Sequence, residues 1–197
     1  MSDFKAALRV SQISVAWTLV ASAAAVVAGV AAGSLVLVAF GVTGLLDAAG
    51  SYALIVSFRH ALRHDGVDPR RERIALRIIG IGLIVVGALT TIESVRRLMT
   101  GSNAERSAVG VAIASASVFM LAALTFRKMQ LAERLASRGL RADGWLSATG
   151  ALLAVITVVG TLLAGRADWA DPVAALAVAI GAAGLGVESL RAEPEAA

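Results

Sequence analysis

The sequence contains no cysteine, few charged residues and few aromatic ones. None of its 197 residues is cysteine, 16% are charged and 5% are aromatic. The absence of cysteine excludes disulfide bonds, thiolate metal ligands and a cysteine nucleophile. A soluble domain of ordinary composition is about one-quarter charged. The scarcity of charge therefore argues against a water-soluble protein.

Long stretches without formal charge make up much of the chain. Residues 10–46, 107–126 and 144–165 contain no Asp, Glu, Lys or Arg, and the mean hydropathy is +0.80. About 20 apolar residues are enough for a helix to cross the hydrocarbon core of a bilayer. The first stretch is too long for one crossing, so we expect a turn at Ala32, Gly33 and Ser34. Because it continues into a second span, we interpret its start as a retained helix and not a cleaved signal.

These features predict an all-α integral membrane protein, a bundle of six transmembrane helices. The predicted membrane domain covers residues 1–190 and is followed by a short cytoplasmic tail, 191–197. The six spans are predicted at about 10–32, 35–58, 74–98, 107–126, 142–164 and 172–190.

With six crossings, most basic residues fall on one side of the membrane. That side receives 14 of the 18, in the N-terminal segment, in the connections 59–77 and 127–141, and at Arg191. Basic residues near span ends mark the cytoplasmic face, so both termini are predicted to be cytoplasmic, in a plasma membrane of the bacterial type. Pairs such as Arg127 and Lys128 are expected to fix this orientation and contact anionic lipid. The net charge of +4 is therefore not interpreted as nucleic-acid binding.

Asp47 is the only charged residue between positions 10 and 58. A carboxylate at membrane depth is costly unless it faces protein, water or a cation. Thr43 and Ser51 lie four residues to either side, so the three side chains share one helix face. Their oxygen atoms are hard donors that suit a cation or a proton. The alternative is an aspartate that only fixes helix packing.

Two weaker candidate sites lie near the predicted cytoplasmic face. Asp143 opens the fifth span, where it could serve transport or instead interact with the helix dipole and Arg141. His60 and His64 are four residues apart and Asp68 follows them, a spacing that can place both imidazoles on one metal ion. The alternative is a pair of solvated histidines at the membrane edge. No pairing of a nucleophile with a base is visible, so we do not expect an enzyme.

Three stretches of the sequence carry a family resemblance. They are Gly33-Ser34 leading to Asp47, Leu140-Arg141-Ala142-Asp143 at the start of span five, and the segment from Trp169-Ala170-Asp171-Pro172 to Glu188-Ser189-Leu190 in the last span. In order and spacing, the chain resembles the transmembrane domain of the cation diffusion facilitator family. The resemblance covers nearly all of the membrane-associated residues and implies a six-helix bundle of that type.

The resemblance also implies a function. In that family, spans two and five together build a tetrahedral cation site, whose four ligand positions correspond here to Thr43, Asp47, Leu146 and Gly150. Asp47 alone keeps the family's ligand type. The expected function is cation efflux coupled to protons through a site centred on Asp47, with Thr43, Ser51 and Asp143 assisting. A divalent cation is the expected transported substrate, and no resident cofactor is identified.

Two other interpretations remain open. The loss of three ligand positions, and of the cytoplasmic domain that many family members carry, also fits a non-transporting structural or regulatory membrane subunit. An altered site could instead move another solute. The expected partners are the lipid bilayer, a cation and protons. A second copy of the chain, bound through the membrane helices, or a larger complex would complete the assembly.

Overall fold

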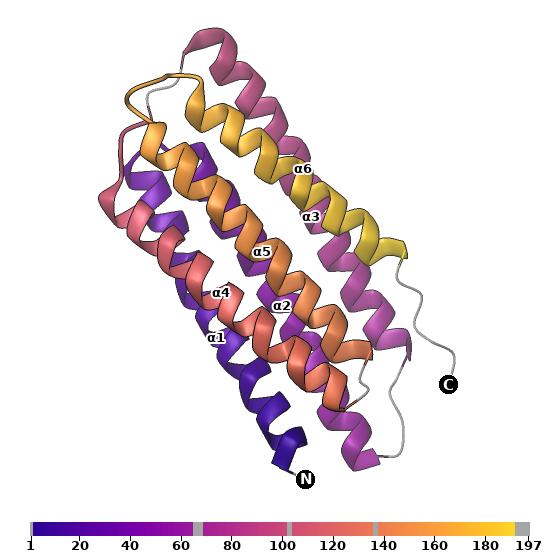
Figure 1. The fold of residues 1–197 in the computed structure, drawn as a ribbon. Coiled ribbons are helices and arrows are strands. Elements are labelled where there is room, and N and C mark those ends of the chain that lie inside the picture. The colour runs from indigo at the N-terminus through magenta and orange to yellow at the C-terminus, as the bar shows by residue number, and fades with distance from the viewer. Residues whose placement is uncertain (1, 65–68, 102–103, 136–137, 192–197) are drawn as a thin grey trace.

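A computed structural model describes residues 2–64, 69–101, 104–135 and 138–191, and these residues fold almost entirely into six α-helices (Figure 1). The connections between the helices are short, so neighbouring helices run in opposite directions. The helices are α1 (Ser2–Ala31), α2 (Leu35–His64), α3 (Pro69–Thr100), α4 (Ala108–Arg134), α5 (Arg138–Leu163) and α6 (Ala170–Arg191).

Each predicted span corresponds to one of these helices. The predicted ranges either lie inside the helix bounds or pass them by one residue. The largest differences are at the start of α1, which begins at Ser2 although its span was predicted from residue 10, and at the end of α4, which continues to Arg134 although its span was predicted to end at residue 126. The predicted turn is present, and Gly33 adopts a positive φ of 61° there, a backbone conformation that glycine adopts without steric cost.

The surface of the bundle is apolar. Val27, Phe119 and Ile180 are each more than two-thirds exposed, and a soluble monomer rarely leaves so much apolar surface in water. Among the described residues, five helical segments are long and apolar enough to cross a membrane, whereas the apolar part of α2, Leu35–Ala49, is shorter. The chain is therefore an all-α integral membrane protein. The five segments are Ala6–Ala31, Ile79–Thr100, Ala108–Arg134, Asp143–Leu163 and Ala170–Arg191.

The six helices form two groups. Helices α1, α2, α4 and α5 pack around one another, while α3 and α6 form a pair along one side that contacts α2 and α5 (Figure 1). Glycines allow α3 and α6 to approach closely, because a Cβ atom on Gly80 would lie 2.8 Å from the Gly186 carbonyl oxygen. Small residues at such crossings permit the backbone contact that holds membrane helices together.

The tightest apolar packing lies toward the end of the bundle that contains the Gly33 turn. There Val36 and Phe40 of α2 meet Ala154 of α5 and Val178 of α6, all of them buried. Phe40 and Leu153 belong to this core and also form part of the wall of a cavity farther along the bundle. The core thus bounds the cavity at one end.

Candidate functional site

A cavity of about 40 Å³ lies among α1, α2, α4 and α5, and Leu185 of α6 also forms part of its wall. A single water molecule needs roughly 10–15 Å³ of cavity volume, so the cavity can hold a small ion together with some water. Its wall is mostly apolar but includes polar side chains from four helices. These are Ser14, Trp17, Thr18 and Ser22 of α1, Thr43, Asp47 and Ser51 of α2, Ser117 of α4, and Asp143 and Ser147 of α5.

The structure brings the candidate residues of α2 and α5 to the same cavity. Thr43, Asp47 and Ser51 line it from one helix, as their four-residue spacing requires. Asp143 lines it from α5, together with Leu146 and Gly150 at the other two expected ligand positions. Residues about 100 positions apart in sequence therefore face one space.

Several polar atoms at the cavity wall have no protein partner. The Thr43 hydroxyl is buried and makes no hydrogen bond, and neither does the Trp17 indole nitrogen. Among the described residues, no donor bonds the half-buried Asp47 carboxylate either. Buried polar groups in folded proteins are nearly always paired. Several unpaired polar groups around one cavity are expected if a ligand or water molecule enters the cavity and bonds to them.

Lys128 is the most deeply buried charged residue at this site. Its side chain is 1% exposed, and its Nζ atom lies 2.9 Å from each of three oxygens: Ser14 Oγ, Ser147 Oγ and Asp143 Oδ2. The prediction that Lys128 contacts lipid is therefore wrong. Because α4 continues past residue 126, Lys128 falls on its buried face, in helical register with Leu121, Leu124 and Leu131.

Asp143 pairs with Lys128, and no hydrogen bond or ion pair joins it to Arg141 in the described part of the chain. Besides the ion pair, its Oδ2 accepts a longer hydrogen bond of 3.4 Å from Ser11 of α1. Asp143 lies five residues inside α5, which begins at Arg138. Asp143 and Asp47 line the same cavity, and Lys128 is bonded to Asp143.

The second candidate metal site cannot be placed. His60 and His64 belong to the last part of α2, but their side chains, and Asp68 as a whole, lie outside the described residues. Within the described residues, no three His, Cys, Asp or Glu side chains come together as a metal site would require.

A second polar cluster lies at the end of the bundle that holds the Gly33 turn. Asp171, which is 1% exposed, accepts hydrogen bonds from the Ser34 hydroxyl at 2.6 Å and from the backbone nitrogens of Leu35 and Val36. Its carboxylate thus caps the first turn of α2. Asp171 lies in the first turn of α6, yet the helix that its carboxylate caps is α2.

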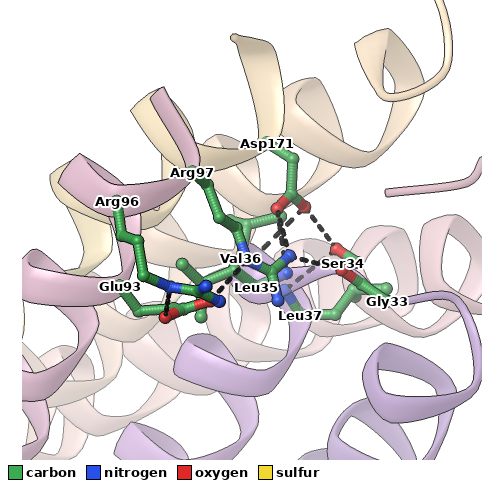
Figure 2. A network of polar contacts seen from close by, with 9 residues as sticks. All are labelled: Gly33, Ser34, Leu35, Val36, Leu37, Glu93, Arg96, Arg97 and Asp171. Atoms are coloured by element: carbon green, nitrogen blue, oxygen red, sulfur yellow. Dashed lines mark hydrogen bonds and ion pairs between the residues drawn. The ribbon is translucent and has the colours of Figure 1, made fainter. Parts of the chain in front are cut away.

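Arg97 joins this cluster to α3. Its guanidinium donates to the Gly33 carbonyl at 2.6 Å and to Glu93 at 3.0 Å, and it lies 3.8 Å from the Asp171 carboxylate (Figure 2). Glu93 also accepts two bonds from Arg96. The cluster connects α2, α3 and α6. Its polar groups bond to one another, which is typical of a cluster with a structural role.

The fold and the cavity define a class of protein: a polytopic membrane bundle that encloses a small cavity with carboxylate and hydroxyl groups in its wall, as membrane transport proteins do. A family model of the cation efflux transmembrane domain matches residues 11–192, and the chain belongs to this family of cation transmembrane transporters. The comparison with curated proteins returns no match. The resemblance seen in the sequence is thereby confirmed, as is the six-helix fold of that type.

We did not predict Trp17, Ser14, Ser147 or the role of Lys128 from the sequence. The signal for Lys128 was its spacing, because it continues the face formed by Ser117, Leu121 and Leu124. For α1, the signal was a polar stripe in an apolar part of the helix, since Ser14, Thr18 and Ser22 follow one another at intervals of four residues and Trp17 lies three residues after Ser14. Neither pattern indicates by itself which helices will surround the polar face.

Proposed function

We propose that this chain moves a cation across the membrane through the cavity, with Asp47 as the principal ligand and Thr43 and Ser51 as supporting oxygen donors. One observation carries the proposal. The Thr43 hydroxyl and the Asp47 carboxylate border the same cavity, and neither is bonded within the described protein. A carboxylate at membrane depth is retained at a free-energy cost. Binding a cation there offsets that cost.

The proposed direction is efflux from the cytoplasm in exchange for protons. The orientation, with both termini cytoplasmic, is supported by the 14 basic residues that share one side. One side chain that binds either a cation or a proton, but not both together, is enough to couple their movements. Rocking of the α3–α6 pair against the other four helices would open the cavity to alternate sides, and α3 and α6 pack more extensively against each other than either does against those four helices.

The site differs from the zinc site implied by the family resemblance. Zinc prefers four nitrogen, sulfur or carboxylate ligands, whereas Leu146 and Gly150 supply no donor from their side chains. Thr43 supplies only a hydroxyl. The donors available in the cavity are oxygens with one unpaired carboxylate among them, a set that suits a hard cation better than zinc.

A second candidate function is a non-transporting structural or regulatory subunit. Leu146 and Gly150 at two ligand positions favour it, as does the Lys128 ammonium that already occupies Asp143. In this alternative, Asp47 would tolerate neutralisation without functional loss, and a stable partner protein would be found with the chain.

Two further predictions concern the assembly and its location. The chain is predicted to form a homodimer through its membrane helices and to lie in a plasma membrane of the bacterial type.

Cation flux into proteoliposomes tests the proposal. Purified wild-type protein and the Asp47→Asn variant are compared for sodium, potassium, manganese, iron(II), cobalt and zinc, each with and without a pH gradient. We expect flux that rises with the gradient and falls at least about tenfold in Asp47→Asn. Asp168→Asn is the matched control, because Asp168 is exposed in the connection between α5 and α6.

The outcomes separate the two candidate functions. Flux that depends on Asp47 but not on Asp168 supports transport through the cavity. Equal flux in wild type and Asp47→Asn contradicts the assignment of Asp47. No flux of any ion from folded, reconstituted protein contradicts transport and favours the subunit.

A further inference from the structure

The buried amino group of Lys128 is a fixed positive charge next to the proposed cation site. Its Nζ atom has three oxygen neighbours at 2.9 Å, and one of them belongs to a carboxylate. An ammonium group has three N–H donors and no acceptor, so three oxygen acceptors satisfy it completely. The Ser147 hydroxyl in turn donates to the Asp143 carbonyl, which leaves its oxygen free to accept from Lys128. Three oxygen acceptors, one of them a carboxylate, suit the charged ammonium.

The charges around the cavity therefore do not balance. Asp47 and Asp143 are the acidic residues in its wall, and Lys128 is the basic residue bonded to that wall. Two carboxylates and one ammonium leave a single negative charge. Unbalanced charge is costly in a medium of low dielectric constant. A ligand with one positive charge neutralises the site, whereas a divalent ion would leave one uncompensated positive charge.

The unpaired atoms agree with this charge. Thr43 and Asp47 offer oxygen donors, which hard cations prefer to nitrogen or sulfur. The Trp17 indole nitrogen is also unpaired, but it can only donate a hydrogen bond. It therefore needs an acceptor, such as a water molecule that enters with the ion. The cavity of about 40 Å³ has room for roughly two waters beside a small ion.

We propose that the site takes a monovalent alkali-metal cation, and that Lys128 determines this preference by standing permanently in the place of one positive charge. The proposal rests on the transport function proposed above and names its substrate class. Lys128 is thus a specificity-determining residue. It acts on the transported ion by neutralising Asp143 and does not contact the ion itself.

Changing the charge balance step by step tests this role. Tracer uptake of sodium, rubidium, manganese and zinc is measured in proteoliposomes containing the full chain. For wild type we expect alkali-ion uptake at least about tenfold above uptake of either divalent ion at equal concentration. Lys128→Met raises the net negative charge to two and should reverse this preference. The double variant Lys128→Met with Asp143→Asn restores a single negative charge and should restore the preference for alkali ions.

Two further variants keep the test decisive. Arg127→Gln removes an exposed positive charge one residue away on the same helix, and it should leave the ion preference unchanged. Asp143→Asn alone brings the net charge of the site to zero and should reduce alkali-ion uptake at least about tenfold. If Lys128→Met does not fold, as judged by gel filtration and circular dichroism, Asp143→Asn and the double variant still carry the test.

The results distinguish this inference from the proposed function. Wild-type flux of zinc or manganese without alkali-ion flux overturns the monovalent assignment and leaves transport intact. Alkali-ion flux with a preference that folded Lys128→Met does not alter overturns the role of Lys128. An absence of flux for every ion overturns both.

Discussion

Asp171 and Asp47 are both acidic residues inside an apolar bundle, yet their surroundings differ in the number of partners they supply. Asp171 is 1% exposed and is satisfied by a hydroxyl, two backbone nitrogens and a nearby guanidinium. Asp47 is half-buried beside a cavity and has no hydrogen-bond donor among the described residues. A carboxylate that joins three helices needs every partner within the protein. One that binds a mobile ion must keep a coordination position free.

In a membrane protein, structural and functional acidic residues can be told apart by their hydrogen-bond and ionic partners. Rarity singles out both residues, because each is a charged residue in an apolar helix. Their bonding partners separate them, because among the described residues Asp171 has several and Asp47 has no hydrogen-bond donor. Four experiments test the cavity and this distinction, and they are ordered from the largest expected change in free energy to the smallest.

Supplying the missing ligands should turn the cavity into a zinc site. Thr43→Asp, Leu146→His and Gly150→Asp together with Asp47 give four metal donors across α2 and α5. A Cβ atom at position 150 would lie 3.2 Å from the end of the flexible Leu121 side chain, which can move aside. We expect calorimetry to give a micromolar Kd where the wild type shows no binding at millimolar zinc, a gain of about 4 kcal/mol.

The zinc experiment has a direct control in Asp47→Asn added to the same triple variant. Removing the fourth ligand should weaken binding strongly if the four positions converge. A folded triple variant that ignores zinc would show that the assignment of ligand positions is wrong.

Asp171→Ala should destabilise the protein strongly. It uncaps α2, removes the acceptor of the Ser34 hydroxyl, and leaves Arg97 with Glu93 as its remaining negative partner among the described residues. Losing one member of such a buried set costs about 3 kcal/mol, which for a chain of this size lowers Tm by roughly 6–12 °C. Tryptophan fluorescence in detergent measures the change, and Asp168→Ala, three residues earlier and exposed, should leave Tm unchanged.

Lys128→Met should have an intermediate effect on stability. It leaves Asp143 without its ionic partner, but Asp143 is 20% exposed and water partly solvates it. We expect a loss of about 2 kcal/mol. Adding Asp143→Asn should recover much of it, with a coupling energy of about 1–2 kcal/mol in a double-mutant cycle. Additive effects of the two substitutions would contradict the ion pair.

Asp47→Asn should have the smallest effect on stability. Among the described residues no hydrogen bond to its carboxylate is lost, so Tm should change by less than the equivalent of about 1 kcal/mol. A decrease as large as that of Asp171→Ala would mean that Asp47 has a structural role. Stability retained together with lost flux is the combination that sets Asp47 apart from Asp171.

Much of the fold could be predicted because the apolar stretches are long and the glycine turn is clear. The bounds of α4 were missed because the basic residues after position 126 indicate a membrane edge, although the helix continues through them to Arg134. Within the candidate site, Thr43, Asp47 and Ser51 were predicted to share a helix face, since that relation depends only on local helix geometry. The arrangement of four helices around them could not be predicted in the same way.

The sequence by itself determined the membrane-embedded helices, the turn at Gly33 and the lone charge of Asp47, because hydrophobicity and helical spacing are local properties of the chain. Only the tertiary structure decided that Asp171 caps α2 and that Lys128 pairs with Asp143 beside Asp47. The reason is physical: a charged group in an apolar bundle must find its partner wherever packing brings one within about 3 Å. Asp171 and Ser34, for example, are more than 100 residues apart in the sequence. No local sequence pattern indicates that two such residues will meet.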